Sequence, residues 1–266
     1  MTGTKRGSIA YKLRAGAASI TLDDADTRNA INSSSVDQLC EAVLRARADH
    51  ASVVVLRSNG RFFSVGGDLA AFGAADDMGA YIDELAGKLH RVVSELTHLD
   101  AIVVTVVQGM AAGAGFPLTA AGDIVVAAKS ARFTLGYTKV GLSVDGGTSL
   151  LVATLGLHRA LRLALLNDVL SADEAQAAGL VARVYDGAEL GESVEKLVAS
   201  LLAGSSSAFA ATKHLLRDSA VPAPETALRN EALAIRSCAE TGDGREGVQA
   251  FPEKRSPEFR ASTNRH

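Results

Sequence analysis

Apolar and polar residues alternate in two short segments near the start of the chain, residues 9–13 and 19–22. A period of two is typical of strands, and the glycine-containing segment 15–17 between them predicts a turn, so together they predict a hairpin or two adjacent strands. The period then changes, because apolar side chains recur at three- and four-residue steps over residues 36–44. This spacing predicts an amphipathic helix, which the serines at 33–35 can cap.

Two continuous apolar runs, residues 52–56 and 101–107, lie on either side of a long segment with helical periodicity at 76–99. Runs rich in β-branched residues are typical of strands that are covered on both faces. Shorter strands are expected at 123–127 and 132–135. The first half of the chain therefore predicts a repeated alternation of strands and helices, which is typical of an α/β fold.

The second half of the chain is mostly helical in its pattern. Residues 171–174 (Ser-Ala-Asp-Glu) match a capping box, and Gly179 ends that short helix before an expected strand at 180–185. The last sixty residues carry three helical stretches and no convincing strand. We therefore expect an α/β core over residues 1–206 and a helical C-terminal region over residues 207–266.

The amino-acid composition and the net charge of the chain exclude several classes of function. The chain has 266 residues, of which 47% are hydrophobic, so it can bury a sizeable core, and its net charge of −3 gives no basic excess for nucleic acid. The two cysteines, Cys40 and Cys238, provide neither a disulfide framework nor a zinc site. The N-terminal residues are polar, and apolar runs such as 102–107 are too short to span a membrane. A cytoplasmic protein is expected.

Two glycine-containing loops follow predicted strands, at residues 66–67 and 109–115. Each is, by itself, most simply a tight turn, and the second lacks the Gly-Lys-Ser/Thr ending of a phosphate loop. Loops that follow adjacent parallel strands can nevertheless converge and offer two backbone N–H groups to one oxygen. That is the geometry of an oxyanion hole, which stabilises negative charge developing on a carbonyl.

Candidate side chains for catalysis are few. The chain contains no Gly-x-Ser-x-Gly elbow and no His-Glu-x-x-His motif, which disfavours acyl-enzyme and zinc-protease chemistry. Asp145 lies at a loop-to-helix junction, where a carboxylate is either a helix N-cap or a catalytic group. His90 lies on the predicted helix at 76–99, where a solvated histidine is the simpler interpretation.

These features together resemble the crotonase (enoyl-CoA hydratase/isomerase) superfamily over nearly the whole chain. The resemblance is carried by six motifs in the family's order: residues 28–32 (Arg-Asn-Ala-Ile-Asn), 63–69, 108–115, 123–127, 171–179 and 245–255. It implies an α/β fold with a spiral of ββα turns forming two roughly perpendicular sheets. It also implies an acyl-CoA thioester substrate, no separate cofactor and no metal. The C-terminal helices are expected to be buried in a homotrimer or a dimer of trimers, because a single spiral core gives them little partner surface.

The resemblance also assigns roles to individual residues. The oxyanion-hole donors would be the backbone N–H groups of Gly67 and Ala114, with Asp145 as the third catalytic group. The positions that match CoA-binding residues of the family are Arg28, Ala30, Ser64, Gly66, Asp68, Leu69, Gly113, Tyr137, Phe251 and Lys254. Lys254 is expected to meet a phosphate of CoA.

The sequence departs from the hydratases of that family at the two catalytic glutamates, whose positions are occupied here by Pro117 and Tyr137. Asp145, in a Gly-Leu-x-x-Asp-Gly-Gly segment, resembles the carboxylate of the ring-1,2-epoxyphenylacetyl-CoA isomerase group, and one carboxylate suffices for isomerisation. The favoured prediction is therefore an enoyl-CoA isomerase. The alternatives are a hydratase, a catalytically inactive acyl-CoA-binding member, and an enzyme similar to 4-chlorobenzoyl-CoA dehalogenase, in which His90 and Tyr137 would match a histidine and a tryptophan.

Overall fold

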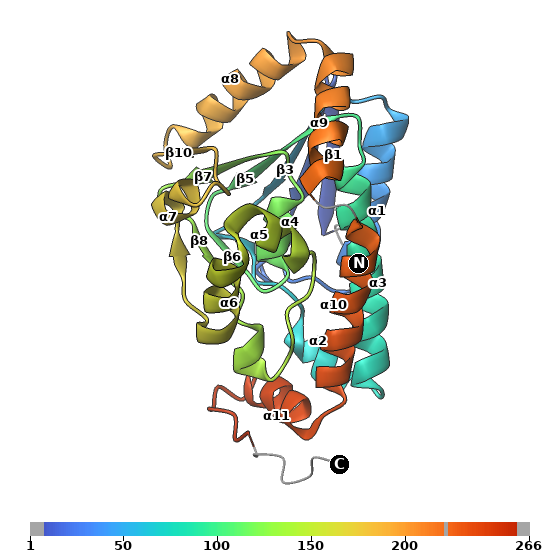
Figure 1. Cartoon of the computed structure of the whole chain (residues 1–266), viewed down its shortest axis with the longest axis vertical. Helices are drawn as coiled ribbons and strands as arrows, with labels where there is room; N and C mark the ends of the chain where they lie inside the picture. The colour runs from blue at the N-terminus through green and yellow to red at the C-terminus, as the bar shows by residue number, and fades with distance from the viewer. Residues whose placement is uncertain (1–7, 221–222, 260–266) are drawn as a thin grey trace, which may run out of the picture.

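The computed structural model describes residues 8–220 and 223–259, which form two β-sheets surrounded by helices (Figure 1). The larger sheet has the order β1-β2-β3-β5-β7-β10, and its neighbours are parallel except for the β1–β2 hairpin. Its strands are β1 (Ile9–Arg14), β2 (Ala17–Leu22), β3 (Val53–Ser58), β5 (Ile102–Val107), β7 (Ile124–Ala128) and β10 (Arg183–Tyr185). The predicted α/β class, the hairpin and the buried central strands are confirmed.

The smaller sheet has the order β4-β6-β8-β9. Its strand β8 (Arg132–Thr134) confirms the strand expected at 132–135, whereas the sequence pattern did not separate β4 (Phe62–Ser64), β6 (Met110–Ala112) and β9 (Leu170–Ser171) from the loops. Strands β4 and β6 are only three residues long, too short for a recognisable alternation. They are parallel neighbours, so the glycine-containing segments that follow them leave the sheet at the same edge. The topology therefore brings the two glycine loops together.

Helices cover the sheets and complete the chain. They are α1 (Ser33–Ala48), α2 (Leu69–Ala74), α3 (Met78–Thr97), α4 (Gly115–Ala120), η1 (Tyr137–Val140), α5 (Thr148–Leu155), α6 (Leu157–Leu166), α7 (Ala172–Ala177), α8 (Leu190–Leu202), α9 (Ser206–Ala220), α10 (Pro224–Ala239) and α11 (Gly242–Ala250). The N-cap of α1 is Asn32, with Ser35 as the reciprocal member of its capping box. Ser171 and Glu174 form the predicted capping box of α7. None of the helices in the described residues is long and apolar enough to cross a membrane.

Helix α10 lies along α3 and buries an apolar stripe against its own chain (Figure 1). The stripe consists of Leu228, Ala232, Ile235 and Ala239. The expectation that the C-terminal helices have little partner surface within one core is therefore wrong for α10. Its position next to α3 also brings residues more than one hundred positions apart in sequence to one side of the molecule.

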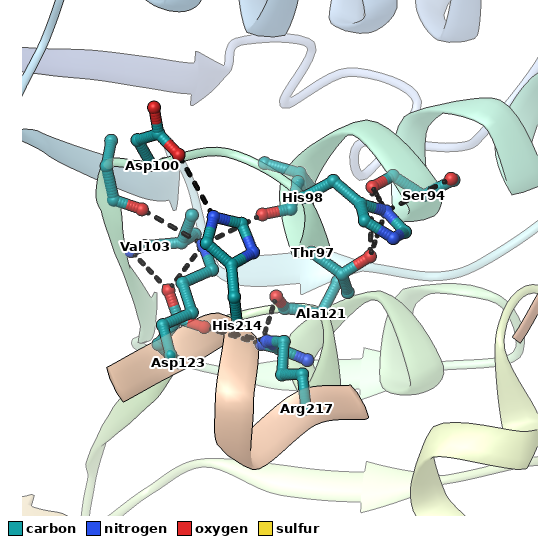
Figure 2. Close-up of polar contacts among 12 residues, drawn as sticks. Ser94, Thr97, His98, Asp100, Val103, Ala121, Asp123, His214 and Arg217 are labelled. Carbon is teal, nitrogen blue, oxygen red and sulfur yellow. Dashed lines mark hydrogen bonds and ion pairs between the residues drawn. The ribbon is translucent and has the colours of Figure 1, made fainter. Parts of the chain in front are cut away.

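Helix α9 is attached to the larger sheet by an ion-pair network (Figure 2). The Lys213 ammonium pairs with Asp123 at 2.9 Å and donates hydrogen bonds to the carbonyl oxygens of Leu96 and Ala101. Arg217 pairs with the other oxygen of Asp123 at 2.7 Å. Burial lowers the pKa of Lys213, and the Asp123 carboxylate opposes that shift. This network supports the fold, since none of its members lines the large cavity described below.

Candidate active site

A cavity of about 700 Å³ opens between the two glycine loops, α2, α3, η1 and the C-terminal segment. Its volume is that of a typical small-molecule site. The apolar part of its wall comes mainly from Phe72, Ile82, Leu85, Ala86, Leu89, Leu142 and Ile235, and cationic side chains at the wall are Arg28, Lys139, Lys254 and Arg255. The cavity therefore combines an apolar surface with positive charge, which suits a ligand that has an apolar end and an anionic end.

The two glycine loops meet at this cavity. A Cβ atom on Gly66 would lie 2.8 Å from the carbonyl oxygen of Ala112 and 3.0 Å from the nitrogen of Ala114, so only glycine allows the approach. Gly66 also has a φ of +85°. Gly67 and Ala114 both line the cavity, and neither of their N–H groups donates a hydrogen bond within the described part of the chain. Both groups are therefore free to bind an oxygen of a ligand.

Asp145 is 4% exposed and is the only carboxylate among the described residues that line the cavity. Its Oδ1 lies 2.7 Å from Nε2 of His90, on the buried face of α3. Gly147, with a φ of +96°, is the N-cap of α5. The interpretations of Asp145 as a helix cap and of His90 as a solvated side chain are both wrong. The two side chains form a buried carboxylate–imidazole pair at the cavity wall.

The backbone of Asp145 is also held in place. Its carbonyl oxygen accepts hydrogen bonds from the Tyr137 hydroxyl at 2.8 Å and from the Thr148 hydroxyl at 3.1 Å. Burial, reinforced by the charges of Asp145 and Glu231, raises the pKa of Tyr137 well above its usual value. Tyr137 therefore stays protonated and remains a hydrogen-bond donor. It also lines the cavity, as its assignment to a binding position requires.

Glu231, on α10, is a member of this cluster that the sequence analysis missed. Its carboxylate accepts hydrogen bonds from the backbone N–H groups of Gly147, Thr148 and Ser149 at 2.8–3.0 Å. Burial is the main cause of a raised pKa for Glu231; the N–H donors oppose that shift and the charge of Asp145 adds to it. A signal was present in the sequence, because Glu231 interrupts the apolar stripe that begins at Leu228.

His90, Asp145 and Glu231 place one nitrogen or oxygen atom each within 4.8 Å of one another. This spacing could hold a metal ion. The oxygens of Glu231 already accept three backbone hydrogen bonds, however, and His90 is bonded directly to Asp145. The arrangement is therefore suited to holding and moving a proton.

The residues assigned from the sequence divide into two groups. Those that line the cavity are Arg28, Gly67, Leu69, Gly113, Ala114, Tyr137, Asp145, Phe251 and Lys254. Those outside its lining are Ala30, Ser64, Gly66 and Asp68. Ser64 is fully buried and donates to the carbonyl of Asn29, while Asp68 caps α2. The side chains of Ser64 and Asp68 thus shape the loop, and substrate contact at those four positions stays a prediction.

Comparison with known proteins places this geometry in a family. A model of the family described as enoyl-CoA hydratase/isomerase matches residues 12–262. The chain belongs to the enoyl-CoA hydratase/isomerase family. Its structure is similar to that of an enoyl-CoA hydratase from Mycobacterium avium subsp. paratuberculosis K-10, with a TM-score of 0.87 and 34% identity over 95% of this chain and 98% of that one. The predicted crotonase fold is confirmed, and the family acts on acyl-CoA substrates.

Relatives with different activities are about equally similar to this chain. A probable enoyl-CoA hydratase of Rhodobacter capsulatus is 36% identical over 95% of this chain and 97% of its own length. The 1,2-epoxyphenylacetyl-CoA isomerase of Escherichia coli is 34% identical over 92% and 95%, respectively. Overall similarity therefore identifies an acyl-CoA enzyme of this family without separating hydratase from isomerase, and the expected membership of one subgroup is not established.

Proposed function

We propose that this family member is an acyl-CoA isomerase in which Asp145 transfers the proton and the N–H groups of Gly67 and Ala114 bind the thioester oxygen. The observation that carries this proposal is that Asp145 is the only carboxylate lining the cavity within the described residues. Direct addition of water in this family uses two glutamates, and Pro117 and Tyr137 occupy their positions. A single base fits a reaction that removes and returns one proton.

The proposed reaction conserves all atoms of the substrate. The carboxylate of Asp145 removes a proton from the carbon α or γ to the thioester, and the electron pair of the broken C–H bond moves into an enolate. The two backbone N–H groups stabilise the charge that develops on the enolate oxygen. Protonated Asp145 then returns the proton to a different carbon, which moves the double bond. His90 keeps the carboxylate oriented through its 2.7 Å contact with Oδ1.

The double-bond and the epoxide or oxepin types of isomerisation are both open to this site. The Gly-Leu-x-x-Asp-Gly-Gly segment and the identity to the epoxyphenylacetyl-CoA isomerase support the second type. The apolar wall formed by α3 suits either an aliphatic or an aryl acyl group.

One observation favours a second candidate, nucleophilic displacement on an aryl-CoA ester. His90 lies directly against Asp145, and Tyr137 donates to the backbone of Asp145. In that reaction the Asp145 carboxylate would attack the halogen-bearing ring carbon and expel halide. Water, deprotonated by His90, would then hydrolyse the aryl ester and regenerate the carboxylate.

A panel of CoA thioesters incubated with the protein in deuterated water tests these proposals. We expect 3-enoyl or aryl thioesters to incorporate deuterium and to isomerise, while crotonyl-CoA is hydrated slowly or not at all. Halide release from 4-chlorobenzoyl-CoA would instead establish the displacement reaction. Fast hydration of crotonyl-CoA would overturn the isomerase proposal, and tight binding of every thioester without exchange would identify an inactive binding protein.

We also propose that the chain assembles as a homotrimer or a dimer of trimers. Exposed apolar side chains gather on and next to α6, at Leu157, Leu161, Leu165, Leu166 and Val169, and two more, Leu215 and Leu216, lie on α9. Contact between subunits would remove them from water. Sedimentation at micromolar concentration tests the assembly, and a monomer there would contradict it.

A further inference from the structure

Glu231 is a half-buried carboxylate to which the proton-transfer scheme assigns no role. It does not line the cavity, yet one of its carboxylate oxygens lies within 4.8 Å of a carboxylate oxygen of Asp145 and of a ring nitrogen of His90. It reaches them from α10, which packs against both α3 and α5. Three separate elements therefore converge on one point: α3 with His90, the segment before α5 with Asp145, and α10 with Glu231.

The segment that carries Asp145 has little freedom around this point. A Cβ atom on Gly146 would lie 3.1 Å from that of Ala114 and 3.3 Å from Leu89, so the chain here is held between the glycine loop and α3. Gly147 has a left-handed backbone and supplies no side chain to cap α5. Glu231 takes over that function by accepting the first N–H groups of the helix. It thereby fixes the backbone two residues after Asp145.

The negative charge of Glu231 also acts on the neighbouring Asp145. Two carboxylates this close repel each other when both are ionised, and protonation of either one relieves the repulsion. When Asp145 abstracts a proton it loses its charge, so an ionised Glu231 favours that product. The titratable groups of the described residues that face this point are His90 from α3, Tyr137 from η1, and Asp145 and Glu231 themselves.

We propose that Glu231 is a positioning residue for proton transfer, which fixes the start of α5 and supplies the negative charge that makes Asp145 an effective base. This inference rests on the proposed function, in which Asp145 is the base. It assigns to the α10 helix a part in catalysis besides its apolar contribution to the cavity wall at Ile235.

The test compares Glu231→Gln, Glu231→Asp and the matched control Glu225→Gln. Glu225 lies on the same helix, is exposed, and accepts a hydrogen bond from the Ser94 hydroxyl at 3.3 Å. The assay is deuterium incorporation from solvent into phenylacetyl-CoA, measured as kcat and KM across a range of pH. The assay reports formation of the enolate whichever isomerisation the enzyme performs.

We expect Glu231→Gln to lower kcat roughly 10- to 100-fold with little change in KM, because Asp145 is displaced while the cavity wall is intact. Removal of the negative charge should also move the acidic limb of the pH profile to lower pH, by about one unit. Glu231→Asp keeps the charge but shortens the side chain, so kcat should fall while the limb stays in place. Glu225→Gln should match the wild type in both respects.

The outcomes separate this inference from the proposed function. Absence of exchange in the wild type, both with phenylacetyl-CoA and with the 3-enoyl thioesters of the panel, would overturn the proposed function. Wild-type exchange that is unchanged in Glu231→Gln, in both kcat and pH profile, would overturn only the role of Glu231. If Glu231→Gln does not fold, Glu231→Asp decides, because an unchanged kcat there contradicts the positioning role and a lower kcat at constant KM supports it.

Discussion

Two aspartates, the half-buried Asp123 and the buried Asp145, are each held by residues from distant parts of the chain, yet their surroundings differ in kind. Asp123 pairs with Lys213 and Arg217 and accepts the N–H of Val103, so both of its oxygens are engaged by donors (Figure 2). Asp145 has a histidine as its side-chain partner and a second carboxylate as its neighbour. One aspartate is neutralised by cations, and the other is left able to accept a proton.

The charges around the two aspartates have opposite effects on their ability to accept a proton. Fixed cations stabilise an ionised carboxylate, which makes it a poor base. A neutral or protonated imidazole can share a proton with its carboxylate, and a neighbouring anion favours proton uptake. Of these two aspartates, only Asp145 lines the cavity between the glycine loops. Burial and pairing alone therefore do not indicate catalysis; the identity of the partners and access to a ligand do.

Substitution of each aspartate by asparagine tests whether the two sites differ in function. Asp145→Asn keeps the size of the side chain and removes the base, so turnover should fall about 100-fold or more while affinity for CoA esters is nearly unchanged. The measurement is steady-state isomerisation together with thioester binding by calorimetry. If Asp145→Asn retains full activity and solvent exchange, Asp145 has no catalytic role and His90 or a substrate-assisted route becomes the better candidate.

The matched change at the other site, Asp123→Asn, should act on stability instead. It removes the ion-pair partner of the buried Lys213, which we expect to lower the free energy of unfolding by about 3 kcal/mol. Turnover per folded molecule should stay at the wild-type value. Urea unfolding measures the stability, and the activity of the folded fraction measures the turnover. A loss of turnover without a loss of stability would contradict a purely structural role for Asp123.

Replacement of Lys213, the cation of the ion pair with Asp123, tests the contribution of the other partner. Lys213→Met preserves most of the apolar stem, and Asp123 keeps Arg217 and the Val103 N–H as partners. The loss in unfolding free energy should therefore be about 2 kcal/mol, less than for a fully orphaned ion. A variant as stable as the wild type would mean that Lys213 contributes no net stability to the attachment of α9.

Much of the fold could be predicted from the sequence, because period-two segments, β-branched runs and capping residues are local signals. The core strands β3 and β5 and the capping box at Ser171 are examples. The cluster around Asp145 could be predicted only in part. Glu231 reaches α5 from 82 or more residues away, and no local pattern records which helix α10 packs against. The burial of His90 could not be predicted for the same reason, since its partner depends on how α3 meets the loop before α5.

Removal of the His90 imidazole should lower kcat less than removal of the Asp145 carboxylate. His90→Ala is expected to lower kcat about tenfold, because the Asp145 carboxylate loses the contact that orients it. KM should change little, since His90 is outside the cavity lining. His90→Gln, which can still donate to Oδ1, should recover part of the rate. Equal losses in both variants would point to proton transfer through the imidazole itself.

The smallest expected effect is a pH-dependent difference in stability between the wild type and Glu231→Gln. Burial raises the pKa of Glu231 in the folded protein above its ordinary value of 4.5. Between pH 4.5 and this raised pKa, the folded protein therefore binds more protons than the unfolded chain. Stability from this group is complete below pH 4.5 and is lost as the pH rises through the raised pKa. Glutamine does not titrate, so the unfolding free energy of the wild type relative to Glu231→Gln should fall between pH 4.5 and neutrality, as measured by urea unfolding. An increase over that range would mean that the three N–H donors outweigh burial.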